Sequence, residues 1–219
     1  ENAPEPLGSM MKDLIERRLA DPTLPMEEAF SQQLKEEKLE LPAGQFALFM
    51  NSMYAVDAYV RDYFRKAVLD ALLAEKLPVT VFGEGWEKYS CGDEHSLRRE
   101  PAVPFALSFE RITKAHVLLN VSPIFNRGMH DRVPAGMANH AVVLTDENPY
   151  LRRTFTDGKE LLFYSLEKPD TLCEQAERTL TDVRLREKIA ASAYETFERE
   201  YTWKRRAEQI LAFAEEVEA

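Results

Sequence analysis

Several kinds of residue are scarce in this chain, and each scarcity excludes a class of protein. The 219 residues include two cysteines, Cys91 and Cys173, which provide neither a disulfide framework nor the paired spacing of a zinc site. The 28 Lys and Arg are outnumbered by 38 Asp and Glu, and the net charge of -10 argues against general nucleic-acid binding, which needs clustered cations. A small anionic ligand stays compatible with this charge, because it needs only local donors.

Long apolar runs are also missing. No stretch reaches the roughly 18–20 apolar residues that span a bilayer, and no signal-peptide pattern opens the chain. We therefore expect a cytoplasmic protein with no membrane span, no bound metal and no cofactor of its own. Two prolines and a glycine within residues 1–10 predict a loose tail there.

Familiar catalytic motifs are absent as well. The chain has no nucleophile elbow, no Walker-type GKS or GKT and no HExxH. No residue therefore presents itself as a catalytic nucleophile or base, and the catalytic residues stay unassigned. Paired glutamates, as at Glu27-Glu28 and Glu215-Glu216, are typical of solvated helix faces.

Composition changes near Leu77 and divides the chain in two. Residues 1–76 have helical patterns, most clearly from Gln45 to Lys76, where a run without Pro or Gly carries apolar residues at spacings of three and four. From residue 77 to 219, short apolar runs alternate with helical segments, which is the pattern of βαβ units. We therefore predict an α/β fold with a Rossmann-like parallel sheet flanked by helices, preceded by a helical N-terminal segment.

Within the second part we expect four strands and six helices. The strands are expected at 79–82, 115–121, 141–144 and 161–164. The helices are expected at 103–114, 131–139, 149–155, 169–180, 183–199 and 203–217.

Two glycines follow the first expected strand directly. Gly83 and Gly85 permit positive φ angles and close approach of the backbone to a ligand. The third glycine of a dinucleotide-binding fingerprint would stand at position 88, which is occupied by Lys88. This turn is therefore either a ligand contact or a plain tight turn, and Trp86 is either a stacking surface or a core residue.

The most informative stretch is 115–146, which predicts a strand, a loop, a helix and a second strand. In an open parallel sheet such a loop lies at the carboxyl edge, and the next helix offers free N–H groups to an anion. A phosphate-bearing ligand is therefore expected, with either Arg127 or Arg132 adding a charge-assisted bond. The expected contacts are Asn126, Arg127, Gly128, Met129, His130 and Arg132. Alternatively both arginines form surface ion pairs with Asp131 or another carboxylate, and His130 caps or packs rather than catalyses.

The order of these segments resembles the C-terminal half of GT-B-fold glycosyltransferases. The resemblance lies in VFGEGW, AHVLLNVSPIFNRGMHDRV, MANHAVVLTD and YTWKRRAEQIL, and the most similar group is the group 1 branch that includes spore-maturation-type proteins. It covers about residues 78–214. It implies a domain that binds a nucleotide-diphosphate sugar at the carboxyl edge of its sheet, with the glycine turn and the central loop facing the diphosphate. It also implies that the late helix, near residues 203–206, crosses to the other half of the enzyme.

The chain departs from this family pattern in the central helix. The family phrase R-V-F-E-A-M-A-x-G carries a glutamate that bonds the donor ribose, and Ala135 stands at its place. Losing that partner should weaken donor affinity by roughly 1–3 kcal/mol. Arg127 stands where many relatives have an acid. His140 replaces the usual glycine at the end of the helix, so we expect Asn139 to take the left-handed cap.

The leading prediction is the donor-binding half of a glycosyltransferase, which transfers a sugar to an unknown acceptor by stabilising the departing diphosphate. Complete GT-B enzymes have a second half, so the resemblance implies a missing N-terminal acceptor domain as a partner. Ala135 and the lack of an acceptor half favour an alternative, a non-catalytic binding or assembly module that kept the fold. A flavodoxin-like regulatory domain is a third possibility, against which the long helical lead-in and the three closing helices argue.

Overall fold

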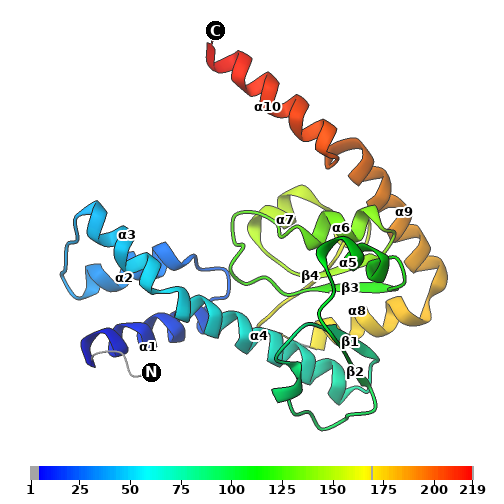
Figure 1. The fold of residues 1–219 in the computed structure, drawn as a ribbon, viewed down its shortest axis with the longest axis horizontal. Coiled ribbons are helices and arrows are strands. Elements are labelled where there is room, and N and C mark those ends of the chain that lie inside the picture. The colour runs from blue at the N-terminus through cyan, green and yellow to red at the C-terminus, as the bar shows by residue number, and fades with distance from the viewer. Residues whose placement is uncertain (1–4, 169, 219) are drawn as a thin grey trace.

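The computed structural model describes residues 5–168 and 170–218, and its chain begins with four helices (Figure 1). These are α1 (Glu5–Ala20), α2 (Met26–Glu36), α3 (Ala43–Ser52) and α4 (Tyr54–Ala74). Because α1 begins at Glu5, the predicted loose tail is wrong for residues 5–10, and residues 1–4 lie outside the described part. The helical run predicted from residue 45 is interrupted at Met53, which separates α3 from α4.

Aromatic and apolar side chains hold the four helices together. Phe30 of α2 is fully buried, and its ring centroid lies 5.3 Å from that of Phe46 and 5.9 Å from that of Phe49. Arg18 of α1 is also buried and forms an ion pair with Asp57 of α4. The hydrophobic cluster that contains Phe30 continues into the sheet through Val142 and Leu144, so the helices and the sheet share one core.

The strands form two separate parallel sheets. The first pairs β1 (Val79–Phe82) with β2 (Leu97–Glu100). The second contains β3 (Val117–Asn120), β4 (Val142–Asp146) and β5 (Leu162–Tyr164), with β4 in the middle and all five of its residues buried. Its register places Asn120 opposite Thr145, and Asp146 opposite Tyr164, so the carboxyl ends of three strands meet at one edge.

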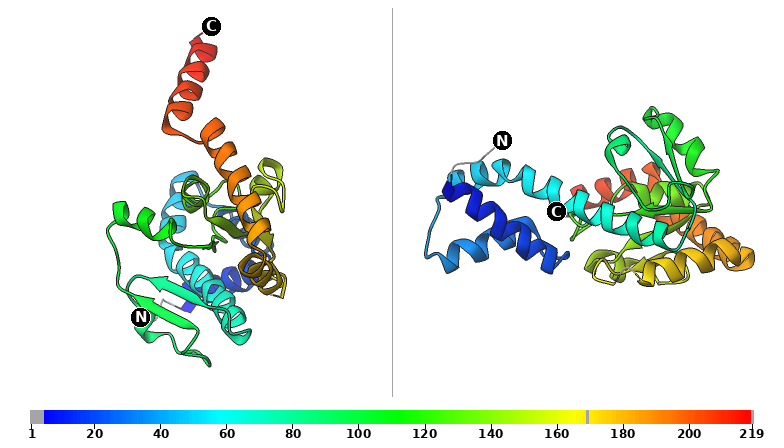
Figure 2. Two further views of the ribbon diagram at one scale, coloured as in Figure 1. Left: turned by 90° about the vertical axis from the view of Figure 1, so that its right-hand side faces the viewer. Right: turned by 90° about the horizontal axis from the view of Figure 1, so that it is seen from below.

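Six helices follow β2 in the chain, and α6, α8 and α9 contact the three-stranded sheet. The six are α5 (Phe105–Ile112), α6 (Arg132–Ala138), α7 (Pro149–Thr154), α8 (Asp170–Thr181), α9 (Val183–Glu200) and α10 (Trp203–Glu218). All six predicted helices and the α/β class are thus confirmed, whereas β2 was not predicted, because its sequence LRRE is mostly charged. In Figures 1 and 2 α10 extends away from the rest of the molecule, and its Trp203 is 90% exposed.

The two sheets differ in how well they are covered. Between β1 and β2 the described chain forms only the short 3-10 helix η1 (Trp86–Lys88) instead of a full covering helix. Thr80 and Phe82 are therefore exposed, and Val81 is the buried residue of β1. The single continuous sheet suggested by the βαβ pattern is replaced by two sheets.

A glycine allows α6 to lie directly on the three-stranded sheet. A Cβ atom added to Gly136 would lie 2.4 Å from Val143 Cγ2 and 2.9 Å from Leu118 Cδ2, so a side chain there would collide with β3 and β4. The helix ends in a Schellman motif, in which the Ala141 N–H donates to the Gly136 carbonyl at 3.1 Å. The left-handed residue of this motif is His140, with φ 56°, and not Asn139 as predicted.

Candidate site at the edge of the three-stranded sheet

A buried polar network occupies the carboxyl edge of the three-stranded sheet, and Asn120 is at its centre. The Asn120 amide donates to Thr145 Oγ1 at 2.9 Å, and its Oδ1 accepts from Ser122 Oγ at 3.0 Å. Its main-chain oxygen accepts from the Tyr164 hydroxyl at 2.9 Å. Each strand of the sheet therefore contributes to the network, which fixes the Asn120 side chain in one orientation.

This network holds Arg132, the first residue of α6. Arg132 Nε donates to Asn120 Oδ1 at 2.9 Å, and Nη2 donates to Ser122 Oγ at 3.0 Å. These acceptors are neutral, and no carboxylate in the part of the chain that the structure describes forms an ion pair with Arg132. Burial, reinforced by the nearby positive charge of Arg65, lowers the pKa of Arg132. The guanidinium is thus oriented by the protein while its charge is left for a ligand.

Two further basic side chains lie near Arg132. Arg65 comes from α4, and burial together with Arg61 lowers its pKa. Burial and the charge of Arg132 also lower the pKa of His130, against the opposing effect of Asp131. Positive charge therefore gathers at this edge from two elements distant in sequence, in a chain that is acidic overall.

The loop before α6 is attached to the N-terminal helices. Asn126 is buried, and its amide donates to the main-chain oxygen of Thr23, in the turn between α1 and α2, at 2.6 Å. Arg127 forms an ion pair with Glu28 of α2, and both side chains are exposed. Arg127 thus has the surface partner that the alternative interpretation predicted, although with a different carboxylate, whereas Arg132 has none.

Main-chain donors at the start of α6 are less available than predicted. The Arg132 N–H donates to His130 Nδ1 at 3.2 Å, so His130 caps the helix. The N–H groups of Val133 and Ala135 donate to the carbonyls of His130 and Asp131. The expectation of free N–H groups is therefore wrong for these three amides, and a helix of seven residues adds only a small dipole.

The remaining residues predicted in this loop and helix have structural contacts. Asn148 Nδ2 donates to the Phe125 and Gly128 carbonyls at 2.7 and 3.1 Å, which fixes the loop around Gly128. Met129 is partly buried and packs against the cluster under α6 and α7. Ala135 lies within α6 and offers no polar side chain in place of the family glutamate.

The glycine turn belongs to the two-stranded sheet. Gly83 and Gly85 have φ angles of 128° and 89°, which explains why glycine occupies these positions. Trp86 is partly buried against the cluster around β1 and β2, and its Nε1 donates to the Phe82 carbonyl at 3.3 Å. None of these three residues lines either of the two cavities described below, so their contact with a ligand stays a prediction.

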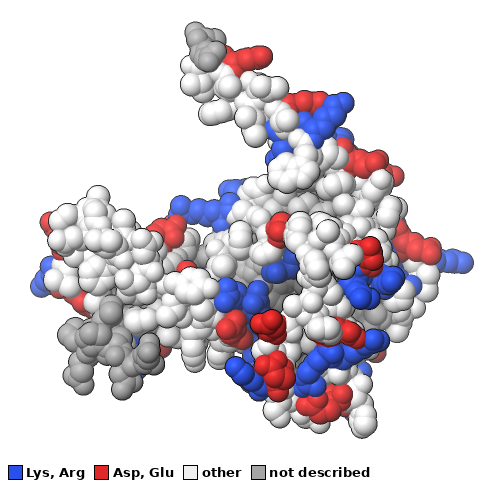
Figure 3. Space-filling view, in the orientation of Figure 1, with Lys and Arg blue, Asp and Glu red and all other residues white. Residues whose placement is uncertain are grey.

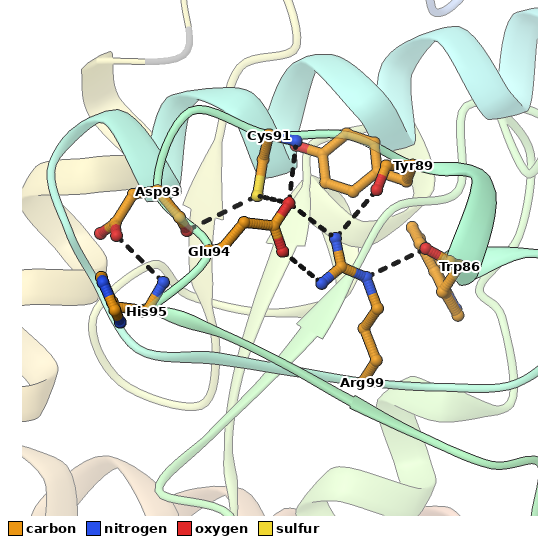
Figure 4. A network of polar contacts seen from close by, with 7 residues as sticks. All are labelled: Trp86, Tyr89, Cys91, Asp93, Glu94, His95 and Arg99. Carbon is orange, nitrogen blue, oxygen red and sulfur yellow. Dashed lines mark hydrogen bonds and ion pairs between the residues drawn. The ribbon is translucent and has the colours of Figure 1, made fainter.

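The loop that follows this turn satisfies its polar groups internally (Figure 4). Arg99 donates to the carboxylate of Glu94 at 2.5 Å, to the Trp86 carbonyl at 3.0 Å and to the Tyr89 carbonyl at 2.9 Å. The hydrogen bond from Arg99 lowers the pKa of Glu94 to about 2. Desolvation and the same carboxylate raise the pKa of Cys91, which keeps it as an unreactive thiol.

A cavity of about 110 Å³ lies between the α1–α2 turn and the edge of the three-stranded sheet. Asp146 lines it and is 4% exposed. Its Oδ1 accepts from the Ser122 N–H at 2.8 Å. Burial raises the pKa of Asp146 to about 7, against the opposing effects of the Ser122 N–H and Arg132.

A second cavity of about 440 Å³ adjoins the first near the start of α8. The two cavities share Glu147, Ser165 and Glu167, so they form one continuous region at the ends of β4 and β5. The guanidinium of Arg152 borders the larger cavity and lies 4.5 Å from the centroid of the Phe163 ring. This volume is within the range of small-molecule sites.

Several residues of this edge were missed by sequence reasoning. They are Arg65, Asn120, Ser122, Asp146, Asn148 and Tyr164. For Asn120 and Tyr164 the sequence does hold a signal, because each directly follows an apolar run, VLL and LLF, at the end of a strand. Arg65 gives no such signal, since only the fold brings α4 to the sheet edge.

Residues 61–212 match the family described as glycosyl transferase-like, which is more than half of the chain. The chain belongs to this family. No curated protein matches it. Among solved structures, the crystal structure of Anabaena Alr3699/HepE in complex with UDP-glucose matches with a TM-score of 0.58 and 11% identity, over 68% of this chain and 44% of HepE.

Two other structures match less well. TarM gives a TM-score of 0.49 at 12% identity, over 68% of this chain and 31% of TarM. The C-terminal domain of a glycosyl transferase group 1 family protein (LpcC) from Francisella tularensis gives 0.41 at 11% identity, over 65% of this chain and 79% of that domain. At such identities the HepE match shows the fold alone, and this glycosyl transferase-like chain spans less than half of HepE.

Family and fold together confirm the resemblance to the C-terminal half of GT-B glycosyltransferases. Over residues 5–168 and 170–218, no helix of this glycosyl transferase-like chain is long and apolar enough to cross a membrane. In the same residues no group of three or more His, Cys, Asp and Glu side chains could hold a metal ion.

Proposed function

We propose that this chain is the donor-binding half of a glycosyltransferase and binds the diphosphate of a nucleotide sugar beside Arg132. The observation that carries this proposal is a half-buried guanidinium that is oriented by Asn120 and Ser122 and has no carboxylate partner among the described residues. Membership of the glycosyl transferase-like family supports it, as does the UDP-glucose complex of HepE.

The chemistry of glycosyl transfer explains why such a cation is useful. As the bond to the sugar breaks, negative charge develops on the departing diphosphate. A fixed cation at a site of low dielectric stabilises this charge without having to reorient during the reaction. Arg65 adds to the positive potential beside Arg132.

The acceptor side of the reaction is assigned to no described residue. A separate acceptor domain, as implied by the resemblance, stays a prediction. Nucleotide-sugar donors are compatible with a cytoplasmic location, which we propose on the ground of the substrate class.

A second candidate is a binding or assembly module without activity. Ala135 favours it, because the ribose-binding glutamate of the family is missing. The ion pair between Arg127 and Glu28 also favours it, because one of the two loop arginines is engaged by the protein itself.

Calorimetric titration with UDP-, GDP- and ADP-glucose tests the proposal. We expect one of these donors to bind, and Arg132→Gln to weaken that binding by about 10–100-fold, since a hydrogen bond to a charged group contributes roughly 1.5–3 kcal/mol. Arg127→Gln is the matched control and should bind nearly as the unmodified protein does. Absence of heat with all three donors at millimolar concentration would favour the assembly module.

A further inference from the structure

The last helix, α10, presents an apolar face that no other described part of the chain covers. Figure 2 shows it extending away from the molecule, and α9 is the described element that it contacts most. Five of its large apolar side chains are between 64% and 90% exposed: Trp203, Ile210, Leu211, Phe213 and Val217. A group of apolar side chains left in water in this way normally marks an interaction surface.

The spacing of these residues places them on one side of the helix. Trp203, Ile210 and Val217 follow one another at intervals of seven, with Ala207 and Ala214 between them. Intervals of seven and of three or four are typical of helices that pack side by side along their length. The sixteen residues of α10 give this apolar face a length of roughly 24 Å.

The charged residues of α10 are divided between its two ends. The first turns carry Lys204, Arg205 and Arg206 against one acid, Glu208, whereas residues 209–217 carry two acids and no base. Figure 3 shows basic side chains near the base of the protruding helix and an acidic one towards its outer end. The dipole of a single helix favours the opposite order, with acids at the start and bases at the end. This arrangement therefore does not stabilise α10 by itself.

A second α10 that runs in the opposite direction fits this distribution of charge. If a two-fold axis passes through Ile210, Trp203 lies beside the partner's Val217, because both are seven residues from the axis. Lys204 and Arg205 then lie level with the acidic pair Glu215 and Glu216 of the partner subunit. Among the described residues these two acids form no ion pair, so they are available to the partner. A parallel pair would instead place like charges together.

We propose that α10 is a dimerisation helix, which packs antiparallel against α10 of a second copy of this chain with Ile210 at the two-fold axis. The same patch on both copies makes a closed, self-complementary interface. Two helices of this length bury less than a standard interface of about 1,200–2,000 Å², so we expect reversible association in the micromolar range. The proposal does not depend on donor binding.

Sedimentation velocity of the whole chain over a series of concentrations tests the dimer. Ile210→Glu would bring two carboxylates together at the axis and should raise the dissociation constant at least about 100-fold. Ala212→Glu is the matched control, because it adds the same charge to the exposed opposite face of the same helix, and it should leave the dissociation constant unchanged. Circular dichroism of both variants checks that each is folded.

Charge reversal tests the antiparallel orientation. The double variant Glu215→Lys with Glu216→Lys makes both ends of α10 basic and should raise the dissociation constant by about tenfold. Lys204→Glu with Arg205→Glu makes both ends acidic and should have a similar effect. Mixing the two double variants should restore association, since each basic helix then meets an acidic one. Added salt should weaken the dimer of the unmodified chain.

Two kinds of result would overturn the proposal. A monomer at every concentration, or equal effects of Ile210→Glu and Ala212→Glu, would show that the apolar face does not bind a second copy. A separate acceptor half, to which the resemblance implies that the late helix crosses, would then be its occupant. A dimer that both charge reversals leave unchanged would contradict the antiparallel arrangement.

Discussion

Arg132 and Arg99 are both held by hydrogen bonds next to a parallel sheet, but they differ in whether a carboxylate neutralises their charge. Arg99 is bonded to the carboxylate of Glu94 and to two main-chain carbonyls, so its charge is neutralised within the loop. Arg132 is bonded to a neutral amide and a neutral hydroxyl. The first arrangement fixes a loop, whereas the second presents a cation to a ligand.

The surroundings of the two arginines differ in the same way. Over the β1–β2 unit, at the lower end of the face in Figure 3, acidic and basic side chains lie next to one another. At the edge of the three-stranded sheet, the side chains that accept hydrogen bonds from Arg132 are uncharged, and the buried Asp146 nearby has a pKa of about 7, which makes it partly protonated at neutral pH. The type of acceptor, more than the presence of an arginine, therefore distinguishes a binding position from a structural one.

The largest effect that would sharpen this comparison is the pH dependence of stability caused by Asp146. Its pKa is about 7 in the folded protein and near 4 in the unfolded chain, so the folded state holds the extra proton between these values. The free energy of unfolding should therefore fall as the pH rises from about 4 to 7, by an upper limit of about 4 kcal/mol.

Asp146→Asn should remove this contribution and keep the hydrogen bond from Ser122. We expect the variant to gain stability relative to the original protein at pH 8 and little at pH 5, as measured by urea unfolding. The lowered pKa of His130 acts with the opposite sign but is common to both proteins, so it cancels in the difference. An equal difference at the two pH values would contradict the burial of a charged carboxylate at this edge.

A smaller effect on the free energy of unfolding is expected from a change in packing. One glycine in each of the two regions can be replaced by alanine, which gives a matched pair of variants. Gly136→Ala introduces a methyl group within 2.4 Å of Val143 Cγ2, and such overpacking should lower the free energy of unfolding by about 1–3 kcal/mol. Gly92→Ala, in the loop between β1 and β2, meets no atom within 4 Å and should be nearly neutral. Thermal unfolding of both variants measures this, and equal losses would break the contrast between a tightly packed and an open region.

The smallest expected effect comes from a substitution that makes the hydrogen-bond partners of Arg132 resemble those of Arg99. Asn120→Asp would give Arg132 a carboxylate partner like that of Arg99 and thereby neutralise its charge. We expect donor affinity to fall by about tenfold, or roughly 1.4 kcal/mol, in calorimetry. Glu94→Gln is the control and should leave donor affinity unchanged. Unaltered binding by folded Asn120→Asp would show that the neutral acceptors around Arg132 have no bearing on the ligand.

Much of the fold was predictable because it follows from local patterns. The strand at Val142–Asp146 begins with a continuous apolar run, and the helix at Val183–Glu200 has apolar residues at helical spacing, and neither pattern depends on another segment. The strand at Leu97–Glu100 was not predictable in this way, since three of its four residues are charged and only pairing with β1 makes it a strand.

The candidate site was predictable only in part. Arg132 was expected from the loop sequence, but its neutral partners Asn120 and Ser122 come from a register and a side-chain orientation that exist only in the folded chain. Arg127 looked equivalent to Arg132 in the sequence, and Glu28, which distinguishes them, lies about a hundred positions away. Long-range pairing of this kind leaves no local pattern to detect.

The bonds from Asn126 to Thr23 and from Arg127 to Glu28 have a practical consequence for anyone who shortens this protein. A version trimmed to the region after Leu77 would release both tethers of the loop before α6 and uncover one wall of the cavity beside Asp146. It would also expose the core that α4 shares with the three-stranded sheet, so the opening helices position this loop and cover the sheet at the same time.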